Sequence, residues 1–337
     1  MNAGYEVFLI APHTKNMIVD GVKIIALPEA NTRLHRISLL TLKAFYTAFK
    51  LKADIYHFHD PELLPVGVLL KIFTGQKVIY DVHEDVPRQV LSKYYISKQL
   101  RPTISKIFEI FENHSAKRFD YLITATPFIR DRFLKMRCKA IDVQNMPLLS
   151  EFTNIEHDWG AKEKAVCYIG GINKIRGLYE MLEAMNLLQD VKLYIAGPVE
   201  GKEEKSVMAN SKKVKYLGYL KRDEIKNLFK KVIAGLVLLH PEDNYKKSQP
   251  TKLFEYMSAG LPVITSNFPM WKEIIQSYHC GLCVNPLNPK EIAEAIQYLR
   301  EHQKEARKMG ENGRKVVLEK YNWEKESEKL LKIYRDL

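Results

Sequence analysis

The stretch SQPTKLFEYMSAGLPVIT, residues 248–265, carries the clearest fold signal in this chain of 337 residues. Its pattern predicts a helix that is capped by Thr251 and closed by Gly260, followed by a buried strand. The start of such a helix presents free backbone N–H groups and a positive dipole end, both of which favour a phosphate. Lys252 and Glu255 fall in its first turns, and a carboxylate there can accept hydrogen bonds from two ribose hydroxyls. Taken alone, the pattern also fits an ordinary helix without a ligand.

A second stretch, YIGGINKIRG, places Gly170 and Gly171 after an apolar run, and Lys174 and Arg176 before a helical one. Glycines let a phosphate approach the backbone, and a nearby cation neutralises its charge. A pair of glycines alone is common in turns between strands and helices. Together with the first stretch, however, it predicts a site for a phosphorylated ligand.

Short β-rich runs alternate with longer helical ones throughout the chain. Apolar runs such as VIYDV and AGLVLL are typical of buried strands. The patterns of residues 222–231 and 290–302 are typical of helices. This alternation predicts an α/β protein whose parallel sheets are covered by helices. Ligands bind outside the carboxyl ends of strands in such sheets. The residues that follow predicted strands include His83, Gly170, Gly171, Pro198, Gly218 and Tyr219.

The polar, non-periodic segment 145–164 separates two such series of strands and helices. It predicts two doubly wound, Rossmann-like domains, at residues 1–148 and 149–318, that face a cleft. The last segment, 319–337, is predicted to be a helix that packs back toward the first domain.

The beginning of the chain, AGYEVFLIAP, does not provide the strand, glycine loop and helix with which a doubly wound domain starts. One such unit, about 30 residues long, is therefore predicted to be absent from the first domain. Losing a central strand would leave backbone groups unpaired and a face of the sheet exposed. The alternative is a shortened domain that works as it is.

The composition is that of a soluble globular protein, with 46% hydrophobic and 27% charged residues. No apolar run approaches the roughly 20 residues needed to span a bilayer, and the first residues do not form a signal peptide. A formal net charge of +12 favours anionic partners: phosphorylated small molecules, nucleic acid or lipid headgroups. The chain has only four cysteines, which favours a reducing, cytoplasmic setting, and only one pair, Cys280 and Cys283, has metal spacing.

The sequence resembles glycosyltransferase family 4, a group of nucleotide-sugar transferases with the GT-B fold. The resemblance covers nearly the whole chain and is strongest in PTKLFEYMSAGLPVIT. YIGGINKIRG, VKYLGYL and the terminal NWEKESEKLLKIYRDL extend it through the second half, and HFHDPELLP and VIYDVHED through the first. It implies an acceptor-side N-terminal domain and a C-terminal domain that binds a nucleotide-diphosphate sugar.

By this resemblance, Glu255 would bind the ribose, Arg176 would contact the diphosphate and His83 would face the sugar. His83 and Arg176 would be the catalytic residues. The start of the Lys252 helix would line the phosphates, and the turn at Gly218 would flank the base. The implied donor-binding set is Gly170, Gly171, Lys174, Arg176, Pro198, Leu217, Gly218, Tyr219, Lys252, Leu253, Phe254 and Glu255.

Three features depart from the family pattern. Many members carry a second carboxylate eight residues before the position of Glu255, where this chain has Lys247, so its recognition of the sugar must differ. Many also place an arginine where this chain has Gly171, which leaves Arg176, with Lys174 nearby, as the phosphate cation. The glycine loop of the first domain is missing as well.

The run HFHDPELLP places His57 and His59 on one face of a predicted strand, with Asp60 at its end, as in some metal sites. Without further ligands in the sequence we expect no metal there. The resemblance likewise implies transfer without a catalytic metal or a cofactor, because cationic side chains and helix dipoles stabilise the departing diphosphate. The residues around His83 allow a purely structural polar cluster instead of a catalytic role: Asp81, Glu84 and Asp85.

Two helical stretches, residues 34–52 and 94–119, combine apolar stripes with basic polar faces. They predict either helices that pack on the core or a peripheral surface that contacts a membrane and a lipid-linked acceptor. Nucleic acid is not expected as a partner, because the sequence contains no recognised nucleic-acid-binding module.

Residues and resemblance together predict a retaining glycosyltransferase that moves a sugar from a nucleotide-diphosphate sugar to an acceptor hydroxyl. Its setting would be surface polysaccharide or glycolipid synthesis, in the cytoplasm or at the inner face of the membrane. Two alternatives stay open: a nucleotide-sugar 2-epimerase of the same fold, and a truncated, non-catalytic paralogue that binds an anionic partner or a transferase subunit.

Overall fold

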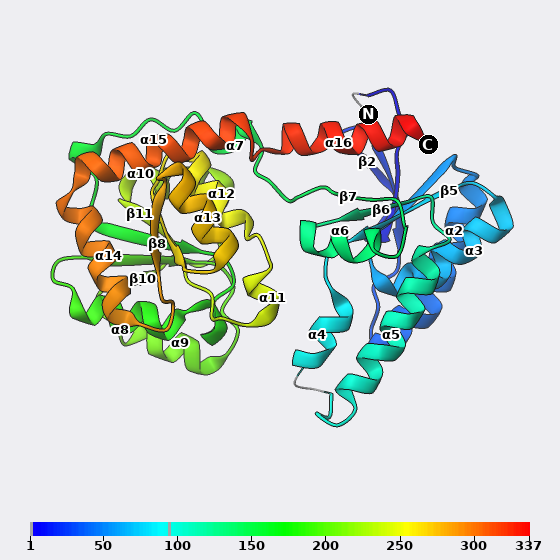
Figure 1. Ribbon diagram of the computed structural model, residues 1–337, viewed down its shortest axis with the longest axis horizontal. Coiled ribbons are helices and arrows are strands. Elements are labelled where there is room, and N and C mark those ends of the chain that lie inside the picture. The colour runs from blue at the N-terminus through cyan, green and yellow to red at the C-terminus, as the bar shows by residue number, and fades with distance from the viewer. Residues whose placement is uncertain (1–2, 94–95) are drawn as a thin grey trace. The chain divides into compact units, whose positions relative to one another are not determined.

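The computed structural model describes residues 3–93 and 96–337, and its contacts divide the chain into two compact units (Figure 1). Unit 1 comprises residues 1–144 together with 327–337, and unit 2 comprises residues 145–326. These divisions lie four and eight residues from the predicted ones after residues 148 and 318. No helix in the described part of the chain combines the length and the apolar character needed to cross a bilayer.

Unit 2 is built on a six-stranded sheet in which every pairing is parallel. The strand order is β10-β9-β8-β11-β12-β13. The bounds of the strands are β8 (Ala165–Ile169), β9 (Lys192–Ala196), β10 (Val214–Tyr216), β11 (Ala234–Val237), β12 (Val263–Ser266) and β13 (Gly281–Val284).

This order is that of a doubly wound Rossmann-type sheet, because the first three strands run outward in one direction and the next three in the other. The direction reverses between β8 and β11, which pair side by side. The predicted α/β fold with parallel sheets is thereby confirmed. A ligand of such a sheet is expected beyond the carboxyl ends of the two strands that flank the reversal.

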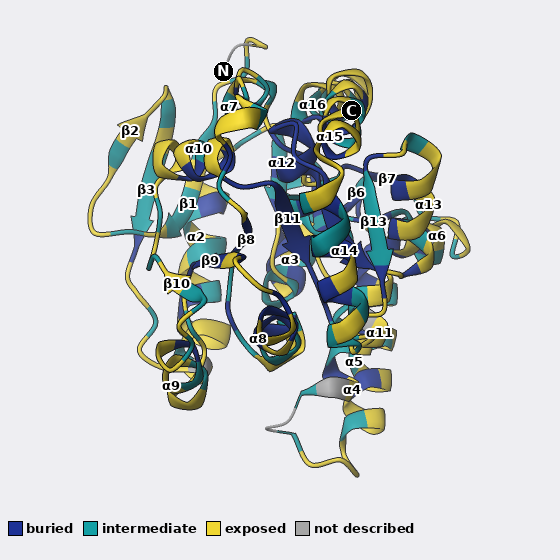
Figure 2. Cartoon of the chain, turned by 90° about the vertical axis from the view of Figure 1, so that its left-hand side faces the viewer, coloured by how far each residue is buried: buried dark blue, intermediate teal, exposed yellow. Residues whose placement is uncertain are grey.

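Helices cover both faces of this sheet and enclose two apolar cores. Figure 2 shows β11 and α12 almost wholly buried between them. The helical segments of unit 2 are α7 (Leu149–Phe152), η3 (Trp159–Ala161), η4 (Lys174–Arg176), α8 (Leu178–Leu187), α9 (Lys202–Ala209), α10 (Arg222–Lys231), α11 (Asp243–Lys246), α12 (Thr251–Ser258), α13 (Pro269–Tyr278), α14 (Pro289–Glu301) and α15 (Gln303–Glu319).

Helix α12 corresponds to the stretch that predicted the fold, with one correction at its start. Pro250 is the N-cap residue and Thr251 is the first helical residue, so the prediction that Thr251 caps the helix is wrong. The ring of Pro250 restricts its φ, here −72°. With ψ at 124° the backbone is extended, and proline offers no side chain that could cap the helix. At the other end Gly260 takes a positive φ of 76°, as predicted for the residue that closes the helix.

Unit 1 contains two sheets where one was predicted. A four-stranded parallel sheet has the order β4-β5-β6-β7, and a three-stranded one has the order β1-β3-β2. Ile10 of β1 packs against the apolar core of the four-stranded sheet, so both sheets share that core. The strands are β1 (Phe8–Pro12), β2 (Met17–Val19), β3 (Val22–Leu27), β4 (Ile55–Phe58), β5 (Lys77–Val82), β6 (Tyr121–Thr124) and β7 (Ala140–Asp142).

Within the described residues, β1 and β4 each pair with one neighbour only, so each has a free backbone edge. That the first domain lacks a strand–loop–helix unit stays a prediction. The helical segments of unit 1 are α1 (Arg33–His35), η1 (Arg36–Leu40), α2 (Thr41–Leu51), η2 (Pro61–Leu63), α3 (Leu64–Thr74), α4 (Val86–Ser92), α5 (Arg101–Ala116) and α6 (Pro127–Leu134). Tyr94 and Tyr95, part of the predicted amphipathic stretch, lie outside the described residues.

The last helix, α16 (Trp323–Asp336), begins in unit 2 and ends in unit 1. At its start, the amide of Trp323 donates a hydrogen bond to the carbonyl of Pro147, at 2.9 Å. Near its end, the hydroxyl of Tyr334 lies 2.6 Å from Nδ1 of His57, and its ring meets that of Tyr5 edge-on at 5.5 Å. The residues from 327 onward therefore complete unit 1.

Candidate functional site

The loops that follow β8, β9 and β10 are hydrogen-bonded to one another in unit 2. The amide of Gly170 donates to the carbonyl of Ala196 at 2.9 Å, and the amide of Gly197 to the carbonyl of Gly218 at 2.7 Å. The amide of Ile172 donates a hydrogen bond to the carbonyl of Pro198 at 2.8 Å. Gly170, Gly171, Pro198 and Gly218, which the sequence identified as residues that follow strands, are thus brought to one edge of the sheet.

Two cations converge on Gly170, the first residue after β8. A Cβ atom at this position would lie 2.6 Å from Nζ of Lys252 and 3.8 Å from Nη1 of Arg176. Gly170 also has a φ of 139°, which side-chain-bearing residues rarely adopt. The structure therefore needs glycine here for both the backbone conformation and the close approach of the two cations.

The ammonium group of Lys252 lies against Tyr168, a buried residue of β8. Nζ donates a hydrogen bond to the Tyr168 hydroxyl at 2.9 Å and lies 4.1 Å from the ring centroid. That hydroxyl in turn donates to the carbonyl of Gly171 at 2.7 Å. Burial, together with the positive charge of Arg176, lowers the pKa of Lys252 to about 7. The site therefore holds two cationic groups close together, which favours a multiply charged anion.

Arg176 ends the short helical turn η4. The side chain of Asn173 caps this turn by accepting a hydrogen bond from the Arg176 amide at 2.9 Å. Nε of Arg176 is buried and has no hydrogen-bond partner. In the described part of the chain, neither Arg176 nor Lys252 forms an ion pair with a carboxylate. Because a buried donor without a partner is costly, this N–H is available to an anionic ligand.

Glu255, one helical turn after Lys252, is largely buried and paired. Its Oε1 accepts a hydrogen bond from Nη1 of Arg222 at 2.7 Å. Nε of Arg222 also lies 3.4 Å from Oε1 of Glu151, and its Cζ lies 5.5 Å from the ring centroid of Phe152. The sequence analysis did not identify Arg222, because its partners lie far away along the chain and no local pattern marks it.

The side chains of Leu253 and Phe254 are fully buried in the core of unit 2. Phe254 packs on Tyr321 with ring centroids 4.9 Å apart, and the amide of Leu253 donates to the carbonyl of Pro250 at 3.0 Å. These two side chains face away from solvent, so they position the helix start rather than present groups to a ligand.

The remaining members of the donor-binding set lie at the surface. Lys174 and Pro198 are exposed, and the side chain of Tyr219 is 85% exposed. Gly218 takes a φ of 69° in the turn between the half-buried Leu217 and Tyr219. This turn leaves an aromatic ring free beside the end of β10.

A pair that the sequence analysis missed lies on the other side of the reversal point. His240 follows β11, and its amide donates to the carbonyl of Ile175 at 2.8 Å. Its Nε2 lies 3.0 Å from Oε1 of Glu180, and both side chains are largely buried. A histidine after an apolar strand was the available signal, but Glu180 lies too far away in the sequence to have been linked to it.

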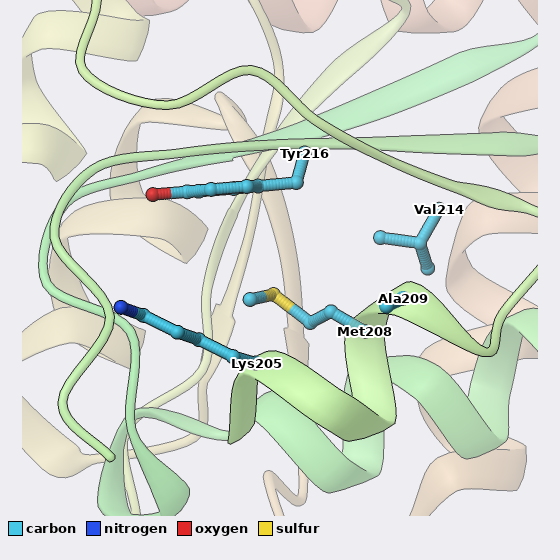
Figure 3. Close-up of a pocket in the computed structure, with 5 residues that line it drawn as sticks. All are labelled: Lys205, Met208, Ala209, Val214 and Tyr216. Atoms are coloured by element: carbon cyan, nitrogen blue, oxygen red, sulfur yellow. The ribbon is translucent and has the colours of Figure 1, made fainter. Parts of the chain in front are cut away.

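A hollow lies between α9 and β10, beside the exposed strand end (Figure 3). Its lining is mostly apolar, and the ring of Tyr216 runs along one side with its hydroxyl donating to the carbonyl of Gly197 at 2.9 Å. None of the predicted donor-binding residues lines it. The lining residues are Lys205, Met208, Ala209, Val214 and Tyr216.

In unit 1, His83 follows β5 and joins a cluster of histidines around Asp81. Nε2 of His83 lies 2.9 Å from Nδ1 of His59 and 3.6 Å from Oδ1 of Asp81. Nε2 of His57 and Nδ1 of His59 lie 3.3 Å and 3.4 Å from Oδ2 of Asp81. Burial alone would raise the pKa of Asp81, but the hydrogen bonds from His57 and His59 hold it well below its usual value. The hydrogen bond to Asp81 also raises the pKa of His59.

The carboxylate in this cluster is Asp81, which the sequence analysis placed beside His83, whereas it grouped His57 and His59 with Asp60. Asp60 instead precedes the short helix η2. Asp85, which the sequence analysis placed in a possible polar cluster around His83, pairs with two arginines instead. Its Oδ1 lies 3.3 Å from Nη1 of Arg132 and 3.6 Å from Nη1 of Arg88. Pairing of β4 with β5 decides this outcome, because it brings residues of the two strands together irrespective of sequence distance.

Solved structures with the same fold are glycosyltransferases and related synthases. Sucrose-phosphate synthase from Thermosynechococcus elongatus superposes with a TM-score of 0.79 and 18% identity, over 99% of this chain and 90% of that one. HepE from Anabaena, solved in complex with UDP and glucose, gives a TM-score of 0.71 and 15% identity, over 94% and 86%. Family models match consecutive parts of the sequence: Glycosyltransferase Family 4 over residues 1–145 and Glycosyl transferases group 1 over residues 151–316.

The chain belongs to a GT-B glycosyltransferase family. An uncharacterized glycosyltransferase of Methanocaldococcus jannaschii is 21% identical to it over an alignment of 316 residues that covers 88% of this chain and 78% of the relative. The family match thus spans both units of this GT-B protein, and the group 1 match contains every predicted donor-binding residue.

Proposed function

We propose that this protein transfers a sugar from a nucleoside-diphosphate sugar to an acceptor hydroxyl, with retention of anomeric configuration. The observation that carries the proposal is the convergence of Lys252 and Arg176 on Gly170, beside the point where the sheet order reverses. Neither cation has a carboxylate partner in the described residues, and a diphosphate supplies the charge that both lack.

Each part of the donor has a proposed partner in unit 2. The diphosphate lies on Arg176 and Lys252. The ribose hydroxyls donate hydrogen bonds to the carboxylate of Glu255, which Arg222 holds in place. The turn at Gly218 flanks the base. HepE, which shares the fold, was solved with UDP and glucose, and this supports a nucleotide sugar as the donor and uracil as the first base to test.

Catalysis consists mainly of stabilising the charge that develops on the leaving diphosphate. Preorganised cations in a partly buried site achieve this without reorganisation during the reaction. Arg176 and Lys252 supply these charges, and we assign no covalent nucleophile. His83 is the proposed catalytic residue of unit 1. Since Lys247 replaces the usual first carboxylate, the sugar must be recognised by other groups.

The exposed helices of unit 1 favour a lipid-linked acceptor for surface polysaccharide or glycolipid synthesis. Helix α3 packs between α2 and α5 (Figure 1). All three helices expose large apolar side chains. Exposed lysines on α2 and α5 add positive charge, which attracts anionic headgroups. The apolar side chains that are at least 58% exposed on these helices are Leu42, Tyr46, Ile72, Phe73, Ile107 and Ile110.

A thermal-shift screen of nucleoside diphosphates and their sugars tests the donor half of this proposal. A ligand at 100 times its Kd should stabilise the folded protein by about 2.7 kcal/mol. A donor found in this way is then incubated with and without acceptor sugars. Transfer to an acceptor supports the proposal, whereas epimerised donor without acceptor, seen by NMR, would favour a 2-epimerase. If no nucleoside diphosphate binds, by melting or by calorimetry, the proposal fails.

A further inference from the structure

Three side chains of unit 1 present metal-ligating atoms at one point. His57 and His59 come from β4 and its end, and Asp81 comes from β5. One ligand atom from each lies within 4.8 Å of the other two. His59 is 54% exposed, whereas His57 and Asp81 are 15% and 13% exposed, so the point is reached from solvent on one side.

The sequence creates this arrangement through the two-residue repeat of strands. His57 and His59 alternate along one strand and therefore share a face. Parallel pairing of β4 with β5 sets His57 beside Ile79 and Phe58 beside Tyr80, so the next residue on each strand brings His59 next to Asp81. The cluster is thus fixed by the backbone pairing of β4 with β5.

Two of the three ligand-to-ligand distances fit a tetrahedral metal ion, and the third is within 4.8 Å. Nε2 of His57 lies 3.3 Å and Nδ1 of His59 lies 3.4 Å from Oδ2 of Asp81. In tetrahedral zinc sites with bonds of about 2.0–2.1 Å, neighbouring ligand atoms are about 3.3–3.4 Å apart. These two ligand-to-ligand distances therefore need little adjustment for an ion to be held.

The surroundings complete such a site. The Tyr334 hydroxyl lies 2.6 Å from Nδ1 of His57, which orients the ring and leaves Nε2 directed toward Asp81. Outer groups of this kind usually hold ligating histidines in place. Nε2 of His83 lies 2.9 Å from Nδ1 of His59, but His83 is the proposed catalytic residue and is not counted among the ligands.

We infer that His57, His59 and Asp81 form a binding site for one divalent transition-metal ion of the zinc type. Two imidazoles and one carboxylate suit zinc and its neighbours, whereas calcium and magnesium require more oxygen ligands. The inference departs from the expectation that these histidines hold no metal. It does not depend on the proposed transfer reaction, whose donor residues lie in unit 2.

The test uses the full chain without an affinity tag, freed of metal by a chelator and then titrated with Co²⁺ and Zn²⁺. We expect one equivalent of Co²⁺ to produce visible absorption, Zn²⁺ to displace it, and calorimetry to give one site. His59→Ala and Asp81→Asn should each weaken binding at least tenfold, and Tyr334→Phe by about tenfold. His114→Ala, at an exposed histidine of α5, is the matched control and should bind as the parent does.

Thermal melting of each variant confirms that it is folded, and His59 is exposed enough for its truncation to be tolerated. Absence of binding in the parent chain would overturn the inference, as would binding that is unchanged in both His59→Ala and Asp81→Asn. The cluster would then be a hydrogen-bonded network only. Because no donor or acceptor is present, this result is independent of whether the protein transfers a sugar.

Discussion

The carboxylate of Glu255 is held by Arg222, whose Nη1 lies 2.7 Å from Oε1, although the two residues are 33 positions apart in the chain. Arg222 is the first residue of α10, and Glu255 lies in α12. The ion pair compensates the charge of a largely buried carboxylate and orients it. A ribose bound by Glu255 would therefore meet a carboxylate that is already in position.

Replacing Glu255 by alanine should weaken nucleoside-diphosphate binding by roughly 10- to 100-fold. Hydrogen bonds to a charged group contribute about 1.5–3 kcal/mol, and the ribose would lose its acceptor. Calorimetry with the nucleotide found by thermal shift measures the effect. Glu151→Ala is the matched control, since it removes the other carboxylate of Arg222, and its affinity should change less than twofold. An unchanged affinity in Glu255→Ala would remove Glu255 from the site.

Arg176→Ala should chiefly slow turnover, with a fall in kcat of about 10²- to 10³-fold. Removing one preorganised donor to a developing negative charge typically has this effect. Arg176→Lys should retain part of the rate, because the charge stays while the fork of N–H donors is lost. The exposed Arg307, which pairs with Glu311 on α15, provides the control Arg307→Ala. Product formation at the parent rate in Arg176→Ala would disprove the role.

Diphosphate binding should be coupled to proton uptake by Lys252. Burial and the charge of Arg176 lower the pKa of Lys252 to about 7, so at pH 8 the free protein holds it mostly neutral, and a bound diphosphate favours the protonated form. Binding at pH 8 should take up close to one proton. Affinity should fall by up to about tenfold per pH unit above 7. Calorimetry in buffers of different ionisation enthalpy measures the uptake, which Lys252→Met should abolish and Lys205→Met should leave intact.

The same pKa has a consequence for the protein without ligand. Between pH 7 and 10.5 the unfolded chain binds a proton at Lys252 that the folded chain does not, so this group makes the free energy of unfolding rise with pH in that window. Lys252→Met should therefore melt higher than the parent at pH 7, and the difference should shrink toward pH 10. A lower melting temperature at pH 7 would contradict the assignment.

Local sequence patterns were sufficient to predict most of unit 2. The bounds of α10 agree with the prediction to the residue, and Gly260 closes α12 as expected, because both depend on short-range periodicity and backbone conformation. The cap of α12 differs because a proline precedes Thr251, and its restricted backbone takes the capping position. Lys252 and Arg176 meet at Gly170, because the loops and helix starts that carry them gather at the edge where the parallel strands end.

Contacts that depend on strand pairing or on distant partners could not be predicted. The sequence of α10 contains no pattern that identifies Arg222 as a partner of Glu255. Glu180 meets His240 only because β11 lies beside β8. Asp81, rather than Asp60, joins His57 and His59 because the register of β4 against β5 brings them together. Side-chain partners across a sheet are set by register, and a single sequence shows no register between separate strands.

Charge on the apolar face of α5 should reduce binding to lipid. We expect Ile107→Glu with Ile110→Glu to lower sedimentation with vesicles of phosphatidylglycerol and phosphatidylcholine several-fold, because both side chains are more than 60% exposed and lie one turn apart. Leu187→Glu, at an exposed leucine of unit 2, is the control. Equal sedimentation of parent and double variant, or no binding by the parent, would contradict a lipid-facing role for α5.

Gly235→Ala should destabilise unit 2 by about 1–3 kcal/mol, because an added Cβ would overlap the buried ring of Tyr256 in a closely packed core. The hydroxyl of Tyr256 accepts a hydrogen bond from the amide of Ile169 at 3.0 Å, so displacement of the ring also disturbs the end of β8. Urea unfolding measures the loss. Gly160→Ala, where a Cβ meets only ordinary contacts, should change stability by less than about 0.5 kcal/mol. Equal stability of the two variants would contradict this prediction.

The passage of α16 from one unit into the other means that unit 1 is assembled from two separate pieces of polypeptide, with unit 2 inserted between them. A fragment cut after residue 144 would lose the Tyr334 hydroxyl at His57 and the aromatic partner of Tyr5. Nζ of Lys329 lies 3.5 Å from the carbonyl of Asp142, so the two pieces meet close to the cut. Splicing residues 327–337 behind residue 144 through a short flexible linker is therefore the natural design for producing this half of the enzyme alone.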